Sequence, residues 1–213
     1  MGVYAIYAAA AFIAGVAGGF AISWLTKPEG VRLSLSFREH RIRLILICAV
    51  CAAAFETALY HGYGDIPTEF ITCFVTVFFM LWLAVTDFTG SVLPNKILLI
   101  WLACRVLLVT LSGVIDRSLA VPAYSIAGAL IIGVLFLIMY YISRRTLGGG
   151  DVKLSFVLGF SLTLTNVFNA VFYGLIVCAL FAVAGLITKK LKRKDLLPLG
   201  PFLFIGTLIA YLL

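Results

Sequence analysis

Long apolar stretches alternate with short polar and basic segments along the chain, and this alternation predicts a bundle of membrane-spanning helices. A hydrocarbon core of about 30 Å takes roughly 20 apolar residues per helical crossing, and several uncharged stretches meet or approach that length. We predict eight crossings, at residues 3–25, 44–60, 70–86, 95–112 and 119–142, two more within 154–188, and one at 196–213. The fold class is therefore an all-α polytopic membrane protein, with one membrane domain over residues 1–213.

The uncharged stretch 154–188 is too long for one untilted crossing, because a single helix of this length would reach roughly 50 Å. Its polar segment Thr163, Leu164, Thr165 and Asn166 predicts a break between a short sixth helix and a full seventh one. The sixth and eighth segments are accordingly expected to be short or interrupted.

Basic residues indicate the orientation of the predicted bundle. Fourteen of the sixteen Lys and Arg residues fall in loops at one end of it, at residues 26–43, 96, 144–153 and 189–194. Because short cytoplasmic loops carry an excess of Lys and Arg, we place these loops in the cytoplasm and both termini outside. The net charge of +7 then indicates topology and contact with anionic lipid, with no nucleic-acid signature.

Composition supports the bilayer as solvent, because 63% of residues are apolar and only 12% charged, whereas soluble domains carry about a quarter charged residues. The longest polar stretch, 26–43, is too short to form a core of its own. Cys48 and Cys51 form a C-x-x-C spacing inside an apolar segment, where a zinc ion would lack further ligands. We therefore predict no metal at these cysteines, and the acid pair described below requires no metal or cofactor.

One acidic residue at the predicted cytoplasmic boundary is Asp87, in the sequence LAVTDFTGSVLPNK. It closes the third segment, where a helix C-terminus disfavours negative charge, so its position has no simple stabilising reason. The alternative is an interfacial Asp in a solvated turn, in which Gly90 and Ser91 shape the loop and Pro94 starts the next helix.

A second acid, Asp151, lies in RRTLGGGDVKL directly after Gly148, Gly149 and Gly150. A helix cap is one interpretation of its position. Three glycines exceed what a cap needs, because they permit positive φ values and close backbone approach, so we expect something to bind against this backbone. The pattern lacks the Lys-Ser/Thr ending of a phosphate-binding loop.

Two carboxylates at one depth on one side permit acid–base chemistry on a peptide. Close like charges resist joint ionisation, so the pair shares a proton, and the ionised member can activate water while the protonated member polarises the scissile carbonyl. Because Asp151 begins a helix and Asp87 ends one, we expect Asp151 to be the more readily ionised.

Three blocks of sequence resemble the bacterial type IV prepilin peptidases, which belong to the G-x-G-D class of membrane aspartyl proteases. They are DFTGSVLPNK, GGGDVKL and LPLGPFLFIG. The resemblance implies that Asp87 and Asp151 are catalytic. It also implies residues that shape or support the site, and we take these to be Gly148, Gly149, Gly150, Lys153, Pro94 and Asn95.

The resemblance further implies a multi-pass enzyme of the bacterial cytoplasmic membrane that removes basic leader peptides from prepilins or pseudopilins at the cytoplasmic face. Many such enzymes carry a cysteine-rich insertion, linked to N-methylation of the new terminus, where this chain has only residues 26–43. That stretch contains no cysteine, so we predict peptidase activity alone or with unaided methylation.

Other functions remain open at the level of sequence. A presenilin-like intramembrane protease shares G-x-G-D but normally has its acids deeper in the bilayer. An ion-coupled transporter could use the acids as a relay, and a partner-binding subunit would follow if they lay too far apart. Glu56 and Arg105 lie within apolar segments, where they either pair across the bundle or separate, with Arg105 snorkelling outward.

Overall fold

The computed structural model describes residues 67–90, 93–115, 117–143, 147–162, 164–189 and 197–212. Every regular element in these ranges is helical, which confirms the all-α class for this part of the chain. The helices are α3 (Pro67–Gly90), α4 (Asn95–Ile115), α5 (Ala120–Ile142), α6 (Gly149–Ser161), α7 (Leu164–Ile187) and α8 (Gly200–Leu212). The first two predicted crossings, loop 26–43 and Glu56 lie outside the described residues.

The chain divides into two compact units, Met1–Phe74 and Val75–Leu213, and the second contains all but the start of the described helices. Within it, the long uncharged stretch is divided as predicted, because α6 ends at Ser161 and α7 begins at Leu164. The helix resumes earlier than expected, so Thr165 and Asn166 belong to α7. Both α6 and α8 have 13 residues, about 20 Å of helix, and are short as predicted.

Three described helices are long and apolar enough to cross a bilayer: Asn95–Ile115, Ala120–Ile142 and Asn166–Ile187. Large apolar side chains are exposed along them, including Leu107, Ile142 and Leu180, each at least 65% exposed. A surface of this kind is unfavourable in water and suits contact with lipid tails. The chain is therefore a membrane protein.

Glycines bring the helices together in pairs. A Cβ atom on Gly128 of α5 would lie 2.5 Å from the carbonyl oxygen of Gly159 on α6, and the reverse contact is equally close. In the same way Gly206 of α8 lies directly against Ala170 and Gly174 of α7. Small residues at such positions allow helix backbones to approach closely in membranes, and here they join α5 to α6 and α7 to α8.

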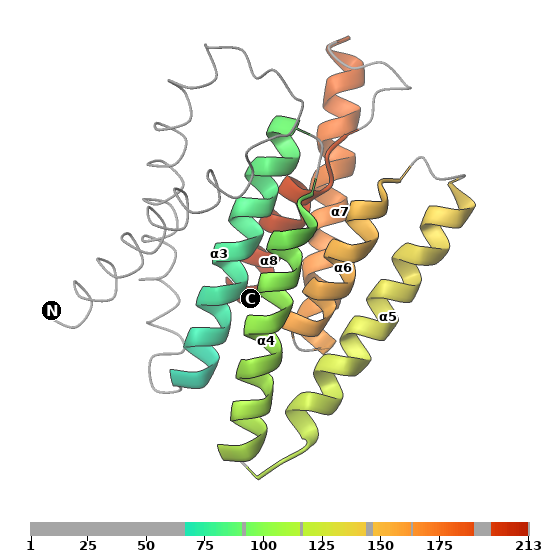
Figure 1. The fold of residues 1–213 in the computed structure, drawn as a ribbon. Coiled ribbons are helices and arrows are strands. Elements are labelled where there is room, and N and C mark those ends of the chain that lie inside the picture. Colours follow the sequence, from blue (N-terminus) through green and yellow to red (C-terminus); the bar gives the residue numbers. More distant parts are fainter. Residues whose placement is uncertain are drawn as a thin grey trace, which may run out of the picture. The chain divides into compact units, whose positions relative to one another are not determined.

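Successive helices of the second unit alternate in direction (Figure 1). As a result, the C-terminal end of α3 and the N-terminal ends of α4, α6 and α8 lie at one end of this unit, and hydrogen bonds join α3 to α8 and α4 to α6 there. The predicted site residues lie in these helix ends or directly before them.

Candidate active site

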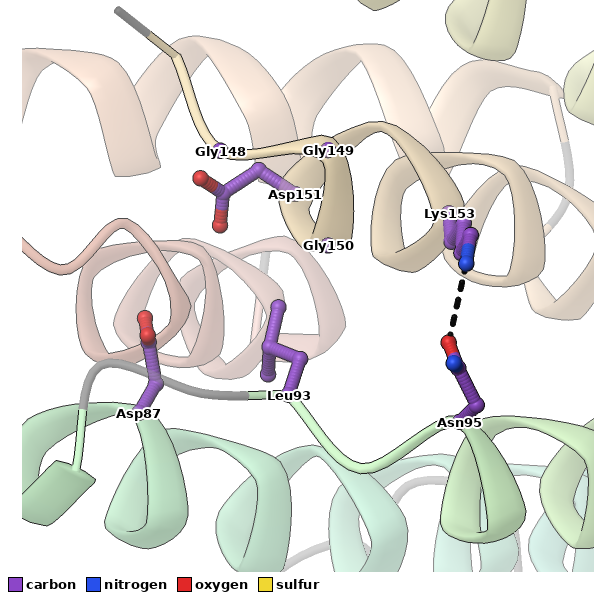
Figure 2. Close-up of a pocket in the computed structure, with 8 residues that line it drawn as sticks. All are labelled: Asp87, Leu93, Asn95, Gly148, Gly149, Gly150, Asp151 and Lys153. Carbon is purple, nitrogen blue, oxygen red and sulfur yellow. Dashed lines mark hydrogen bonds between the residues drawn. The ribbon is translucent and has the colours of Figure 1, made fainter.

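Two carboxyl groups face one pocket of about 410 Å³ at the gathered helix ends. The residues that line it are Asp87, Leu93, Asn95, Gly148, Gly149, Gly150, Asp151 and Lys153. Asp87 and Asp151 point into the pocket from opposite sides (Figure 2). Every residue predicted for the site therefore lines this pocket except Pro94, which is half-buried between Leu93 and Asn95.

Asp87 lies in the last turn of α3, and only 5% of it is exposed. Its Oδ2 accepts a hydrogen bond of 2.8 Å from the backbone N–H of Gly200, the first residue of α8. A solvated turn is therefore the wrong interpretation of this residue. The carboxylate ends its own helix, but it also meets the N-terminus of another, where free N–H groups and the helix dipole favour negative charge.

Gly200 is a site residue that sequence reasoning did not single out. A Cβ atom there would lie 2.8 Å from Oδ2 of Asp87 and 3.1 Å from its Cβ, so a larger residue would displace the carboxylate. The available signal was the Gly-Pro step in the LPLGP block, at the start of the last helix. Nothing in the sequence indicates that Gly200 forms a hydrogen bond with Asp87, which lies 113 positions earlier.

Asp151 is the third residue of α6, and Gly148 is the N-cap of that helix, with φ −66° and ψ 136°. The Asp151 carboxylate receives a backbone hydrogen bond from Gly148. This is the contact that an acid at the third helical position makes in a capping box. Asp151 therefore caps the start of α6 and also lines the pocket, so the two interpretations of its position are compatible.

The three glycines differ in what surrounds them. A Cβ on Gly148 would lie 2.9 Å from Oδ2 of Asp151, and one on Gly150 would lie 3.1 Å from Leu93, whereas Gly149 faces open space. Close approach is thus confirmed at Gly148 and Gly150. The positive φ values that glycine permits are not used, because none of the three adopts the left-handed conformation.

The electrostatic environments of the two acids are unequal. Burial, together with the neighbouring charge of Asp87, raises the pKa of Asp151 to about 6, although the Gly148 hydrogen bond opposes the rise. Burial also raises the pKa of Asp87, and the Gly200 hydrogen bond opposes it. Each acid therefore has a raised pKa and a backbone N–H that opposes the rise. The expectation that Asp151 ionises first considered only the helix that carries each residue, whereas the Gly200 contact places Asp87 at a helix N-terminus as well.

Lys153 and Asn95 form the rim of the pocket. The Lys153 ammonium donates a hydrogen bond of 3.0 Å to Oδ1 of Asn95, and both side chains are otherwise exposed (Figure 2). This contact joins the first turn of α4 to the second turn of α6. Within the described ranges no cluster of three or more His, Cys, Asp or Glu side chains is arranged to hold a metal ion.

Comparisons with known proteins match much of this chain. A family model described as the type IV leader peptidase family matches residues 74–183, more than half of the chain. The chain is also 29% identical over 178 residues to a prepilin leader peptidase/N-methyltransferase of Bacillus subtilis (strain 168). That alignment covers 84% of this chain and 67% of the relative. No solved structure matches the chain.

The substitution Asp87→Asn should lower the pKa of Asp151 from its value of about 6, because it removes the adjacent negative charge that raises it. The pKa should stay above the ordinary value for Asp, since burial persists. Infrared titration of the carboxyl C=O stretch in protein labelled with ¹³C-aspartate would measure this. An unchanged titration in the variant would show that the two carboxyl groups do not interact.

Proposed function

Because the chain belongs to the type IV leader peptidase family, we propose that Asp87 and Asp151 form an aspartyl dyad that removes the basic leader peptide of prepilin-like or pseudopilin-like substrates. The reaction takes place at the cytoplasmic face of the bacterial membrane. The observation that carries the proposal is one pocket lined by two carboxyl groups, one of which has a pKa raised to about 6 by burial and by its partner.

The unequal environments suggest separate roles. Asp87, supported by the Gly200 N–H, is the general base that removes a proton from water as its oxygen attacks the scissile carbonyl carbon. Asp151 is the acid that donates its proton to the carbonyl oxygen. Asp87 then returns its proton to the amide nitrogen as the C–N bond breaks, and Asp151 recovers its proton from the collapsing diol.

Two rival functions for the acid pair fit the geometry less well. An ion relay and a presenilin-like protease both favour acids well within membrane helices. The pocket instead is lined at the beginnings of α4 and α6 and the end of α3, and the start of α8 bonds to Asp87 beside it. A substrate with a basic leader and an apolar helix would present its cleavage point at such a boundary between polar and apolar surroundings.

N-methylation is a second activity named for the Bacillus relative. Loop 26–43 of this chain contains no cysteine, so it lacks the ligands for a cysteine-held metal there. We propose peptidase activity for this chain, alone or with methylation that needs no such insertion.

Asp87→Asn and Asp151→Asn should each abolish cleavage of a co-expressed prepilin-like substrate while leaving the protein in the membrane. The reason is that either change removes the acid or the base of the pair. A gel shift measures cleavage, and mass analysis of the mature N-terminus reveals any added methyl group. Retained cleavage in either variant would exclude the dyad, and absence of cleavage by the unaltered protein across several pilin classes would exclude the function.

Alanine substitutions of the pocket glycines and of Gly200 should differ in their effect on cleavage according to position. Gly150→Ala and Gly200→Ala should each lower the cleavage rate by about 100-fold or more, because the new methyl group would displace Leu93 or the Asp87 carboxylate and shift the acid pair. Gly149→Ala should lower the rate less than either of these changes, because its methyl group would enter the open pocket and displace no protein atom. Equal losses at all three positions would contradict the steric argument.

The pH dependence of kcat/KM should show a loss of cleavage as pH rises through about 6, because Asp151 must keep its proton and its pKa is raised to about 6. At lower pH the rate should fall again once Asp87 becomes protonated. Cleavage of a soluble leader-peptide substrate by detergent-purified protein from about pH 4 to about pH 8 would measure both limbs. A rate that rises continuously across this range would contradict the assigned roles.

A further inference from the structure

Helix α6 carries Asp151 near its first turn and ends inside the protein. It spans only about 20 Å, and its last residue, Ser161, is 1% exposed. The final carbonyl groups of a helix have no partners within that helix, and leaving one buried without a hydrogen bond is costly, above all in a membrane. The C-terminal end of α6 therefore needs a donor from another element.

Arg105 of α4 supplies that donor. Its side chain is 4% exposed, and its Nη2 donates a buried hydrogen bond of 2.8 Å to the Ser161 carbonyl oxygen. A cation at a helix C-terminus also has the favourable sign for the helix dipole. Arg105 consequently does not snorkel outward, and the other predicted partner, Glu56, lies outside the described residues.

The same two helices are joined again near the pocket by the Lys153–Asn95 hydrogen bond. The Lys153–Asn95 and Arg105–Ser161 hydrogen bonds are about 15 Å apart along α4 and about 12 Å apart along α6. The two helices therefore run parallel and are joined at two heights. Buried side chains of both helices, including Trp101 and Leu158, lie between these heights in the sequence. Sliding of α6 along α4 would break both connections.

We propose that Arg105 is a positioning residue, which sets the axial position of α6 and thereby the placement of the Asp151 carboxyl group opposite Asp87. This inference rests on the proposed function of the acid pair. Arg105 bonds to a residue ten positions beyond Asp151, about 15 Å along the helix, so it acts through α6 and not on the substrate. Its fixed planar fork suits this task better than the flexible ammonium group of lysine.

Steady-state kinetics of the full-length protein would test this. Arg105→Met should lower kcat by about 10-fold to 100-fold with KM within about 2-fold, because a misplaced catalytic group slows the reaction without weakening substrate binding. Arg105→Lys should retain an intermediate kcat, and it carries the test if Arg105→Met does not accumulate. Arg117→Met, which removes an exposed cation between α4 and α5, should match the unaltered protein.

The position of α6 can also be measured without any cleavage assay. Such a measurement tests the role of Arg105 separately from the proposed function. The Cβ of Leu93 lies 3.1 Å from the position of a Cβ on Gly150, close to disulfide range, so Leu93→Cys with Gly150→Cys reports the position of α6. The five native cysteines are first replaced by alanine. Oxidation should join the pair readily, and Arg105→Met should slow this at least several-fold.

A slower disulfide together with a lower kcat supports the positioning role. An unchanged disulfide rate would overturn it. An unchanged kcat of Arg105→Met in the protein that keeps Leu93 and Gly150 would also overturn it, if the same substitution slows the disulfide in the cysteine-pair protein. If the unaltered protein cleaves no substrate, the proposed function fails, whereas the disulfide rate still shows whether Arg105 holds α6 in place.

Discussion

Two partly desolvated carboxyl groups facing one pocket are the constraint on which the rest of the site depends. Like charges at close range raise each other's cost of ionisation, and burial adds to that cost. The fold offsets it by giving each acid a backbone N–H at a helix start, from Gly200 for Asp87 and from Gly148 for Asp151. This explains why three helices begin, and one ends, at the same place.

Close backbone approach follows from that constraint. Gly200 has no side chain because the Asp87 carboxylate occupies the space, and Gly148 has none because Asp151 folds back over it. Only Gly149 faces open space, at the wall of the pocket. The glycines of this site therefore matter because they have no side chain and leave room for the carboxylates. The positive φ values that glycine permits are not used.

Much of the arrangement could be predicted from the sequence, because apolar length and polar breaks set helix bounds almost independently of tertiary contacts. The short α6 and its separation from α7 followed from such patterns. That Asp87 and Asp151 act as a pair was implied by the family resemblance, and their separation could not be set from the sequence, although both line one pocket. The surroundings of Asp87 did not follow from these patterns, because they depend on α8, whose contact with Asp87 leaves no local mark in the sequence. Arg105 was recognised as unusual, but its Ser161 partner could not be identified from spacing alone.

The separation of 113 residues between Asp87 and Gly200 also bears on biogenesis. Because a chain is synthesised from its N-terminus, α3 enters the membrane long before α8 exists. During that interval Asp87 lacks the N–H that favours its charge. The environment of this carboxyl group is therefore complete only after α8 has been made and has packed against the end of α3.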